Sequence, residues 1–181
     1  VIDALRARRA RRLGGDASAD GRTIALVVEG GSMRGAYSAG GMMALARLGY
    51  AEMFDRIYAT SAGVMNASYF LSQQPDLGIS VYFDSLTDRR FWNPFRFWKI
   101  LDIDWLFREV IAREKALDVE RVMQSPTKFY VTLMDRRGEP HVVHTQESSE
   151  PLLRLLKAAV AVPVFYNRSV SIEGRGCMDG G

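Results

Sequence analysis

Short apolar runs alternate along the chain with longer helix-forming segments. Residues 23–29, TIALVVE, form a β-branched apolar run that is typical of a buried strand. A glycine-rich turn follows it, and then a helix-forming segment that closes at Gly49. The pattern predicts strands at 23–29, 54–60, 127–135 and 139–145, and helices at 36–49, 62–73 and 149–162, the last with Glu150 and Pro151 in its first turn.

The order of these elements predicts the fold class. Strands that alternate with helices favour an α/β fold with a mostly parallel central sheet. Residues 79–125 are mostly helix-forming with aromatic interruptions, and residues 168–181 are typical of short strands separated by glycine turns. We therefore expect one α/β domain over residues 23–181.

The charge distribution separates an N-terminal segment from this domain. The chain carries a net charge of +3, but residues 1–12, VIDALRARRARR, hold five arginines and one aspartate. Residues 14–22 have the composition of a linker. We expect residues 1–22 to be a basic tail and linker, a solvated and frayed helix. Contact of this tail with anionic lipid is the alternative, and nucleic acid is not expected as a partner.

Composition limits the class of protein further. With 48% hydrophobic and 25% charged residues, the chain is typical of a globular domain, and it has no apolar run long enough to cross a bilayer. The single cysteine, Cys177, excludes an internal disulfide and fits a reducing, cytoplasmic location. The chain begins at Val1 and ends with CMDGG, so we expect the domain to continue beyond residue 181.

Two turns carry candidate chemistry. In a parallel sheet the turns after the first and second strands face one crevice, where α/β proteins bind ligands. The second turn, ATSAG, places Ser61 between strand and helix, a position that strains the backbone and exposes the hydroxyl. Small residues let the helix pack close to the strand. The turn comprises Ala59, Thr60, Ser61, Ala62 and Gly63.

The first turn, GGSMRG, is a candidate oxyanion-binding loop. Successive N–H groups of Gly30, Gly31 and Ser32 can form an anion-binding nest, and Arg34 can orient the loop. A phosphate cradle for a nucleotide is the competing interpretation. The loop lacks the Gly-Lys-Ser/Thr ending of a P-loop and the middle glycine of a dinucleotide fingerprint.

A serine nucleophile needs a base, and the chain offers few candidates. His141 and His144 lie three residues apart on a predicted strand, so they point to opposite faces, which argues against a shared metal site. We interpret them as ordinary strand residues. Asp179, in MDGG, follows a short strand and precedes two glycines that can hold it rigidly. In a site shielded from water, such a carboxylate can accept the serine proton directly.

Taken in order, these segments resemble the patatin-like phospholipase family. GGSMRG corresponds to its oxyanion loop, ATSAG to its nucleophile elbow and DGG to its aspartate motif, and the small-residue stretch KAAVAVP precedes the aspartate strand. The EGGSMRG opening and the segment LTDRRF, residues 86–91, resemble most the bacterial branch. The likeness covers Ile24 to Gly181.

The resemblance implies a three-layer α/β/α serine esterase with a Ser–Asp dyad. It implies lipid degradation by acyl-ester or lysophospholipid hydrolysis through an acyl-enzyme, a lipid or acyl-ester substrate, no metal and no cofactor. Peripheral membrane contact is a further expectation, and the oligomeric state stays open. By position, Ser61 is the nucleophile and Asp179 the base. The oxyanion loop is Gly30, Gly31, Ser32, Met33, Arg34 and Gly35, and the aspartate motif ends with Gly180 and Gly181.

Two departures from the family pattern leave an alternative function open. Ser32 replaces the third glycine of the loop, and Ala59 replaces the first glycine of the elbow. Both favour, as the alternative, a lipid-binding or regulatory protein with weak or lost catalysis. The aromatic segment 91–107 is either part of the core or a membrane-facing lid, and its tryptophans are Trp92, Trp98 and Trp105.

Overall fold

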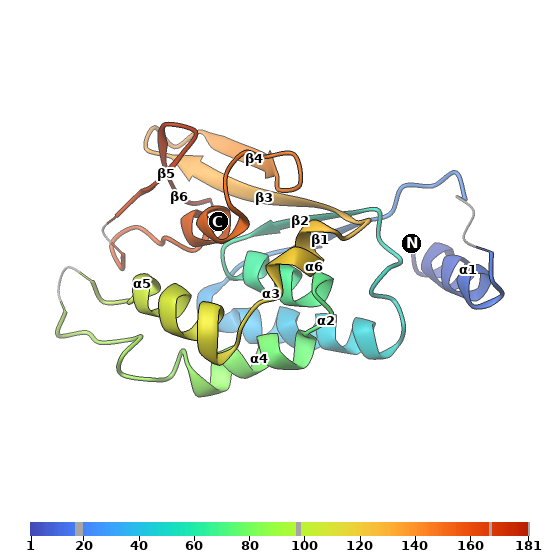
Figure 1. Ribbon diagram of the computed structural model, residues 1–181, viewed down its shortest axis with the longest axis horizontal. Coiled ribbons are helices and arrows are strands. Elements are labelled where there is room, and N and C mark those ends of the chain that lie inside the picture. Colours follow the sequence, from blue (N-terminus) through green and yellow to red (C-terminus); the bar gives the residue numbers. More distant parts are fainter. Residues whose placement is uncertain (17–19, 97–98, 167, 181) are drawn as a thin grey trace.

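The computed structural model describes residues 1–16, 20–96, 99–166 and 168–180, and its six strands form a single sheet. The strand order is β1-β2-β3-β6-β5, with β4 paired to β3 (Figure 1). The predicted α/β class is confirmed. The strands are β1 (Ala25–Val28), β2 (Arg56–Thr60), β3 (Lys128–Asp135), β4 (Pro140–His144), β5 (Val170–Ile172) and β6 (Arg175–Asp179).

Strand direction divides the sheet into two halves. β1 pairs with β2 and β2 with β3 in parallel, each through a helical crossover. β4, β5 and β6 join by antiparallel pairing. The parallel half is therefore the part that the alternation of strands and helices predicted, and the antiparallel half is built from hairpins.

The central feature for the site is that β2 and β6 share one edge of β3. On that edge, β3 pairs with β2 as far as Thr60↔Thr132 and with β6 from Leu133↔Asp179 onward. β4 occupies the opposite edge over the same residues. Because β2 is parallel and β6 antiparallel to β3, the carboxyl ends of β2 and β6 meet head to head beside Thr132 and Leu133. This topology brings residues 61 and 179 together.

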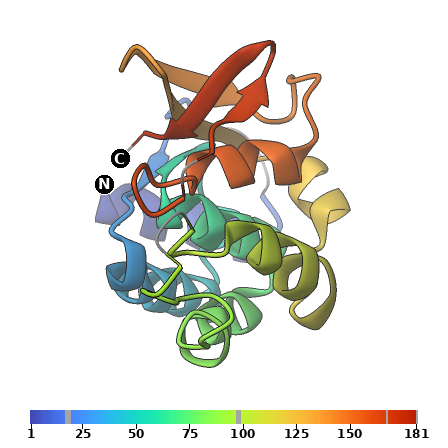
Figure 2. The same ribbon diagram turned by 90° about the vertical axis from the view of Figure 1, so that its left-hand side faces the viewer.

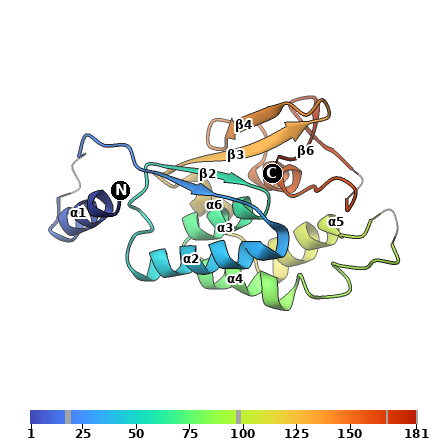
Figure 3. The ribbon, with the colours of Figure 1, turned by 180° about the vertical axis from the view of Figure 1, so that it is seen from behind.

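Helices α3 and α7 pack against the inner face of this sheet, and α2 and α4 pack against α3. Figure 3 shows α2 and α3 below β1 and β2, and Figure 2 shows α7 below the β5–β6 hairpin. The core between strands and helices contains Phe70 of α3 and Leu155 of α7. Four strand side chains are fully buried in the same core: Ile57, Phe129, Val131 and Leu133. The helices are α1 (Ile2–Leu13), α2 (Gly35–Arg47), α3 (Ala62–Leu71), α4 (Pro75–Asp84), α5 (Ile103–Trp105), α6 (Val119–Met123) and α7 (Leu152–Ala159), with a 3₁₀ turn η1 (Ser32–Arg34) and a π-helical segment η2 (Leu106–Glu114).

The outer face of the sheet is partly open. Of the two helical layers expected, the described residues supply the inner one, since α2, α3 and α7 lie on one side of the sheet in Figures 2 and 3. On β1, Val28 is buried but Val27 is 75% exposed. The prediction that residues 23–29 form a buried strand is thus wrong for one face of β1. Buried and exposed positions alternate along this edge strand, but its side chains are apolar on both faces, so the sequence does not show the alternation.

Helix α7 is shorter than predicted. Pro151 has a ψ of 137° and caps the helix instead of lying in its first turn, and the helix ends at Ala159. The chain then extends toward β5, and the amide of Asp179 donates to the carbonyl of Ala161 at 3.2 Å. Residues 160–163 therefore connect α7 to the site rather than prolonging the helix.

The basic N-terminal segment is folded against the domain. Arg8 of α1 forms ion pairs at 2.8 Å with Asp20 and with Asp55, which precedes β2. The hydrogen bond from Arg8 lowers the pKa of Asp20 to about 2. The expectation of a frayed helix is therefore wrong, because these ion pairs hold α1 to the linker and the domain, although none of its residues is buried. In the linker, residues 17–19 lie outside the described residues.

Among the described residues, no helix combines the length and the apolar character that crossing a membrane requires.

Candidate active site

Ser61 lies at the junction of β2 and α3. It is the N-cap residue of α3 and has a φ of 49°, in the region that side chains other than glycine seldom adopt. Thr60 is the last residue of β2, and Ala59, one residue earlier, is buried in the strand. The backbone strain of about 1–3 kcal/mol at such a position is typical of catalytic turns.

Gly63 allows α3 to begin directly against the end of β1. A Cβ atom at this position would lie 2.5 Å from the carbonyl oxygen of Val28 and 2.7 Å from that of Glu29. Any larger residue would push the helix, and Ser61 with it, away from the sheet. Ala62 lines the cavity described below.

The GGSMRG loop packs against the nucleophile candidate. A Cβ atom on Gly30 would overlap the Cβ of Ser61 and lie 3.0 Å from its Oγ. Gly31 has a φ of 128° and Ser32 a φ of 52°, so the backbone turns sharply where η1 begins. At the end of the loop, a Cβ on Gly35 would overlap the hydroxyl of Tyr82.

Ser61 and Asp179 are in direct contact. The Ser61 hydroxyl donates a hydrogen bond of 2.6 Å to Oδ2 of Asp179, a length typical of a bond to a carboxylate. Their exposed fractions are only 8% and 4%. Gly180 packs tightly beside β3, since a Cβ there would lie 2.9 Å from the carbonyl carbon of Leu133. Gly181 lies outside the described residues.

A largely apolar cavity of about 580 Å³ opens beside this pair. Its lining includes Ser32, Met33 and Ser61. The remaining walls are formed by side chains from α3, from α4, from residues 86–111 and from residues 160–165, which follow α7. The volume is in the range of small-molecule sites. An apolar wall next to the GGSMRG loop suits an acyl chain better than the phosphates of a nucleotide.

Comparison with known protein families shows to which family the chain belongs. A family model for patatin-like phospholipases matches residues 26–181. The chain belongs to the patatin-like phospholipase family. The uncharacterized protein YjjU of Escherichia coli is 34% identical over 164 residues, which are 87% of this chain and 45% of YjjU.

The fold of this patatin-like domain also has a solved counterpart. The crystal structure of VipD from Legionella pneumophila superposes with a TM-score of 0.60 at 13% identity, over 88% of this chain and 46% of VipD. The chain thus spans about half the length of both proteins.

The two histidines lie away from the Ser–Asp pair of the patatin-like domain. Both are on β4, across β3 from β2 and β6. His144 pairs with Glu147 at 2.9 Å and stacks on Tyr130 with ring centroids 4.7 Å apart. Neither is in position to serve Ser61, in agreement with their interpretation as strand residues.

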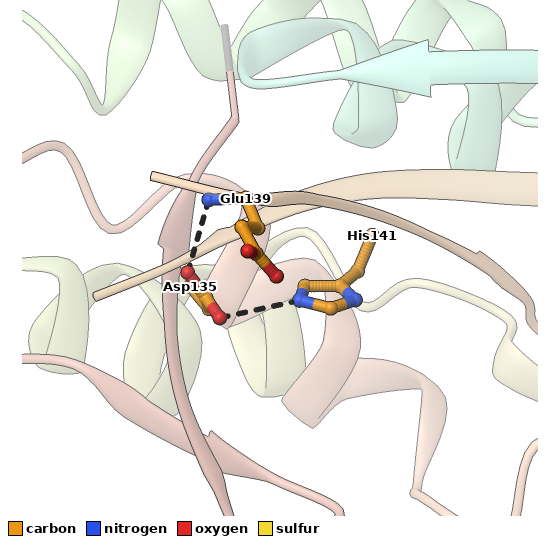
Figure 4. Close-up of side chains that lie close together, drawn as sticks. All are labelled: Asp135, Glu139 and His141. Atoms are coloured by element: carbon orange, nitrogen blue, oxygen red, sulfur yellow. Dashed lines mark hydrogen bonds and ion pairs between the residues drawn. The ribbon is translucent and has the colours of Figure 1, made fainter. Parts of the chain in front are cut away.

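His141 belongs to a cluster with Asp135 and Glu139 at the β3–β4 turn (Figure 4). Asp135 accepts hydrogen bonds from the amides of Arg137 and Glu139, and its other oxygen lies 3.5 Å from the ring of His141. These bonds, that of Glu139 first, lower the pKa of Asp135. The hydrogen bonds of Asp135 stabilise this hairpin turn.

Asn66 and Tyr82 connect the oxyanion-loop segment to the nucleophile helix. The buried Asn66 amide donates to the carbonyl of Gly35 at 2.8 Å and to the hydroxyl of Ser38 at 2.9 Å. Its oxygen accepts from the Tyr82 hydroxyl at 3.0 Å. Burial raises the pKa of Tyr82 to about 12, so this hydroxyl stays protonated and donating. The sequence analysis missed both residues, although a lone asparagine in the apolar helix AGVMNASYFL is the signal that marks such a network.

We expect Tyr82→Phe to lower the free energy of unfolding by about 1–3 kcal/mol, because the oxygen of Asn66 would lose its buried donor. Urea denaturation measures the change. Tyr37→Phe, at an 86% exposed tyrosine on α2, is the matched control and should have no effect. Equal stability of both variants would contradict the network's role.

Gly30→Ala should lower kcat for ester hydrolysis by about 10²- to 10³-fold, the usual effect of disturbing an oxyanion-binding group. The added methyl group would overlap Ser61 and separate the loop from the hydroxyl. Gly41→Ala is the control, since a Cβ on this helical glycine meets no atom within 4 Å. Similar activity of the two variants would show that the loop's contact with Ser61 is dispensable.

Tryptophans of the aromatic segment have different environments. Trp105 is 8% exposed and belongs to the core, whereas Trp92 is 52% exposed and lines the cavity. Trp98 lies outside the described residues. The core interpretation therefore holds for Trp105, and Trp92 faces the cavity mouth.

Proposed function

We propose that this domain hydrolyses lipid acyl esters with a Ser61–Asp179 dyad. Family membership supports a lipid hydrolase in general. The observation that carries the specific assignment is the 2.6 Å hydrogen bond from Ser61 to Asp179 at the wall of a largely apolar cavity. An ester whose acyl chain occupies that cavity places its carbonyl next to the hydroxyl.

The proposed first half-reaction forms an acyl-enzyme on Ser61. Asp179 accepts the proton of Ser61 as Oγ attacks the ester carbonyl. The negative charge that develops on the carbonyl oxygen faces the N-terminal end of α3 and the backbone amides of residues 30–35. The intermediate collapses to an acyl-enzyme on Ser61, and the alcohol leaves with the proton from Asp179.

The second half-reaction repeats these steps with water. Asp179 takes a proton from water as its oxygen attacks the acyl-enzyme carbonyl, and Ser61 regains a proton as the fatty acid leaves. Burial of the dyad strengthens the electrostatic contribution of the loop amides, because the local dielectric is low. Apart from water and the ester, these steps use only Ser61, Asp179 and the amides of residues 30–35 and of the start of α3.

A panel of p-nitrophenyl esters with increasing acyl-chain length tests the proposal. We expect turnover, with kcat/KM rising from short to medium chains as each added methylene is buried in the cavity. The absence of turnover across the panel would contradict the assignment, and turnover without dependence on chain length would contradict the role of the cavity.

One observation favours the alternative of a lipid-binding protein with weak catalysis. Ser32, where the family pattern has glycine, has a φ of 52° and strains the oxyanion loop. By contrast, Ala59 lies in regular strand β2, where its methyl group is buried without strain. Of the two departures, the geometry makes Ser32 the one that can weaken catalysis.

Ser32→Gly should therefore raise kcat, because it relieves about 1–3 kcal/mol of backbone strain in the loop. Ala59→Gly is the matched control and should only lower stability, by about 1 kcal/mol. Steady-state kinetics of both variants on one ester measures the difference. No gain in the Ser32→Gly variant would remove the argument for a catalytically weakened loop.

A further inference from the structure

The mouth of the cavity is surrounded by exposed apolar side chains. Met33, Trp92 and Phe165 line the cavity and are 47%, 52% and 45% exposed. Phe95 and Val164, in the same two loops as Trp92 and Phe165, are 83% and 72% exposed. We call these five side chains the apolar rim.

Backbone hydrogen bonds hold the two main loops of the apolar rim together. Leu101 forms a β-bridge with Trp92, and its amide donates to the carbonyl of Phe165 at 3.1 Å. The amide of Asn93 donates to the carbonyl of Ile100 at 2.9 Å, which closes the loop that carries Phe95. Figures 1 and 3 show both loops at the same end of the molecule. The apolar rim is thus a defined surface.

Positive charge accompanies the apolar rim. Arg34, Arg89 and Arg168 are exposed, each within three residues of a rim side chain, and none has an ion pair within the described residues. Two carboxylates in the same loop are paired, Asp88 with Arg90 and Asp102 with Arg96 and Lys99. Three of the rim side chains, Met33, Trp92 and Phe165, thus have an exposed arginine close by in the chain.

We propose that the apolar rim docks on the surface of an anionic phospholipid bilayer. Exposed aromatic and aliphatic side chains enter the headgroup region, and the three arginines pair with lipid phosphates. In this orientation the cavity mouth faces the lipid. The inference deepens the proposed function, because an acyl chain then passes from the bilayer to Ser61 without crossing water.

Vesicle flotation of the full chain carrying Ser61→Ala tests the proposal by binding alone. Vesicles consist of phosphatidylcholine, with or without phosphatidylglycerol. We expect binding to the anionic vesicles that weakens about tenfold or more in the Phe95→Ser/Val164→Ser double variant. The control, Val27→Ser/Val142→Ser, changes exposed side chains on the outer face of the sheet and should bind like the parent.

A second pair of variants tests the charge. Arg89→Gln and Arg168→Gln should each weaken binding to anionic vesicles by about fivefold, and Arg137→Gln in the β3–β4 turn should not. Thermal melting by circular dichroism verifies that every variant is folded. Absence of vesicle binding by the parent, or equal loss in rim and control variants, would overturn the proposal. Vesicle binding through the rim, together with no ester turnover by the wild-type protein, would overturn only the proposed hydrolysis.

Discussion

Replacing Ser61 with alanine should reduce kcat/KM for ester hydrolysis by at least about 10⁴-fold, because no other hydroxyl takes its place as nucleophile. The Oγ atom lies at the cavity wall and donates a 2.6 Å hydrogen bond to Asp179. Loss of this atom leaves the loop and cavity intact, so the variant should still bind substrate. Ester turnover by purified enzyme, followed spectrophotometrically, measures the effect.

Ser68→Ala is the matched control for this substitution. Ser68 is buried on the same helix and donates only to the carbonyl of Val64. This variant should keep its kcat and lose some stability. Residual activity of Ser61→Ala close to that of Ser68→Ala would contradict the assignment of the nucleophile.

Asp179→Asn should lower kcat by about 10²- to 10⁴-fold with little change in KM, since an amide has the shape of the carboxylate but cannot accept the proton. The 2.6 Å hydrogen bond shows that the carboxylate is already placed to receive it. A lower kcat with an unchanged KM distinguishes a catalytic base from a residue that only shapes the binding site. Steady-state kinetics with substrate saturation provides both constants.

The control for the base is Asp135→Asn. This aspartate lies on β3 and pairs in register with Cys177 of β6, but its hydrogen bonds serve the β3–β4 turn. We expect lower stability and an unchanged kcat. If Asp179→Asn retained full kcat, or lost activity only through KM, direct proton transfer to Asp179 would be excluded.

Local geometry explains why much of the site could be predicted from the sequence. A serine between a strand and a helix, followed two residues later by glycine, specifies a tight turn, and Gly63 has the backbone contacts with Val28 that this turn requires. The position of Gly30 against Ser61 follows from the parallel pairing of β1 and β2, which places their carboxyl ends side by side. Both features depend on short-range rules.

Long-range pairing explains what the sequence did not reveal. The meeting of Ser61 and Asp179 depends on β6 continuing the β3 edge that β2 leaves at Thr132, and no local pattern encodes this register. The glycines that follow Asp179 and the resemblance to a family both pointed to this residue, but the physical cause of its contact with Ser61 is this shared edge. Likewise, the docking of α1 depends on Arg8 finding Asp55, a partner far along the chain that composition alone could not identify.

Covalent labelling by a fluorophosphonate probe, mapped by mass spectrometry, tests the central claim most directly. The dyad predicts that the wild type carries the label on Ser61, that Asp179→Asn is labelled much more slowly, and that Ser61→Ala stays unlabelled. Equal labelling of the wild type and Ser61→Ala, or a label on another residue, would contradict the account.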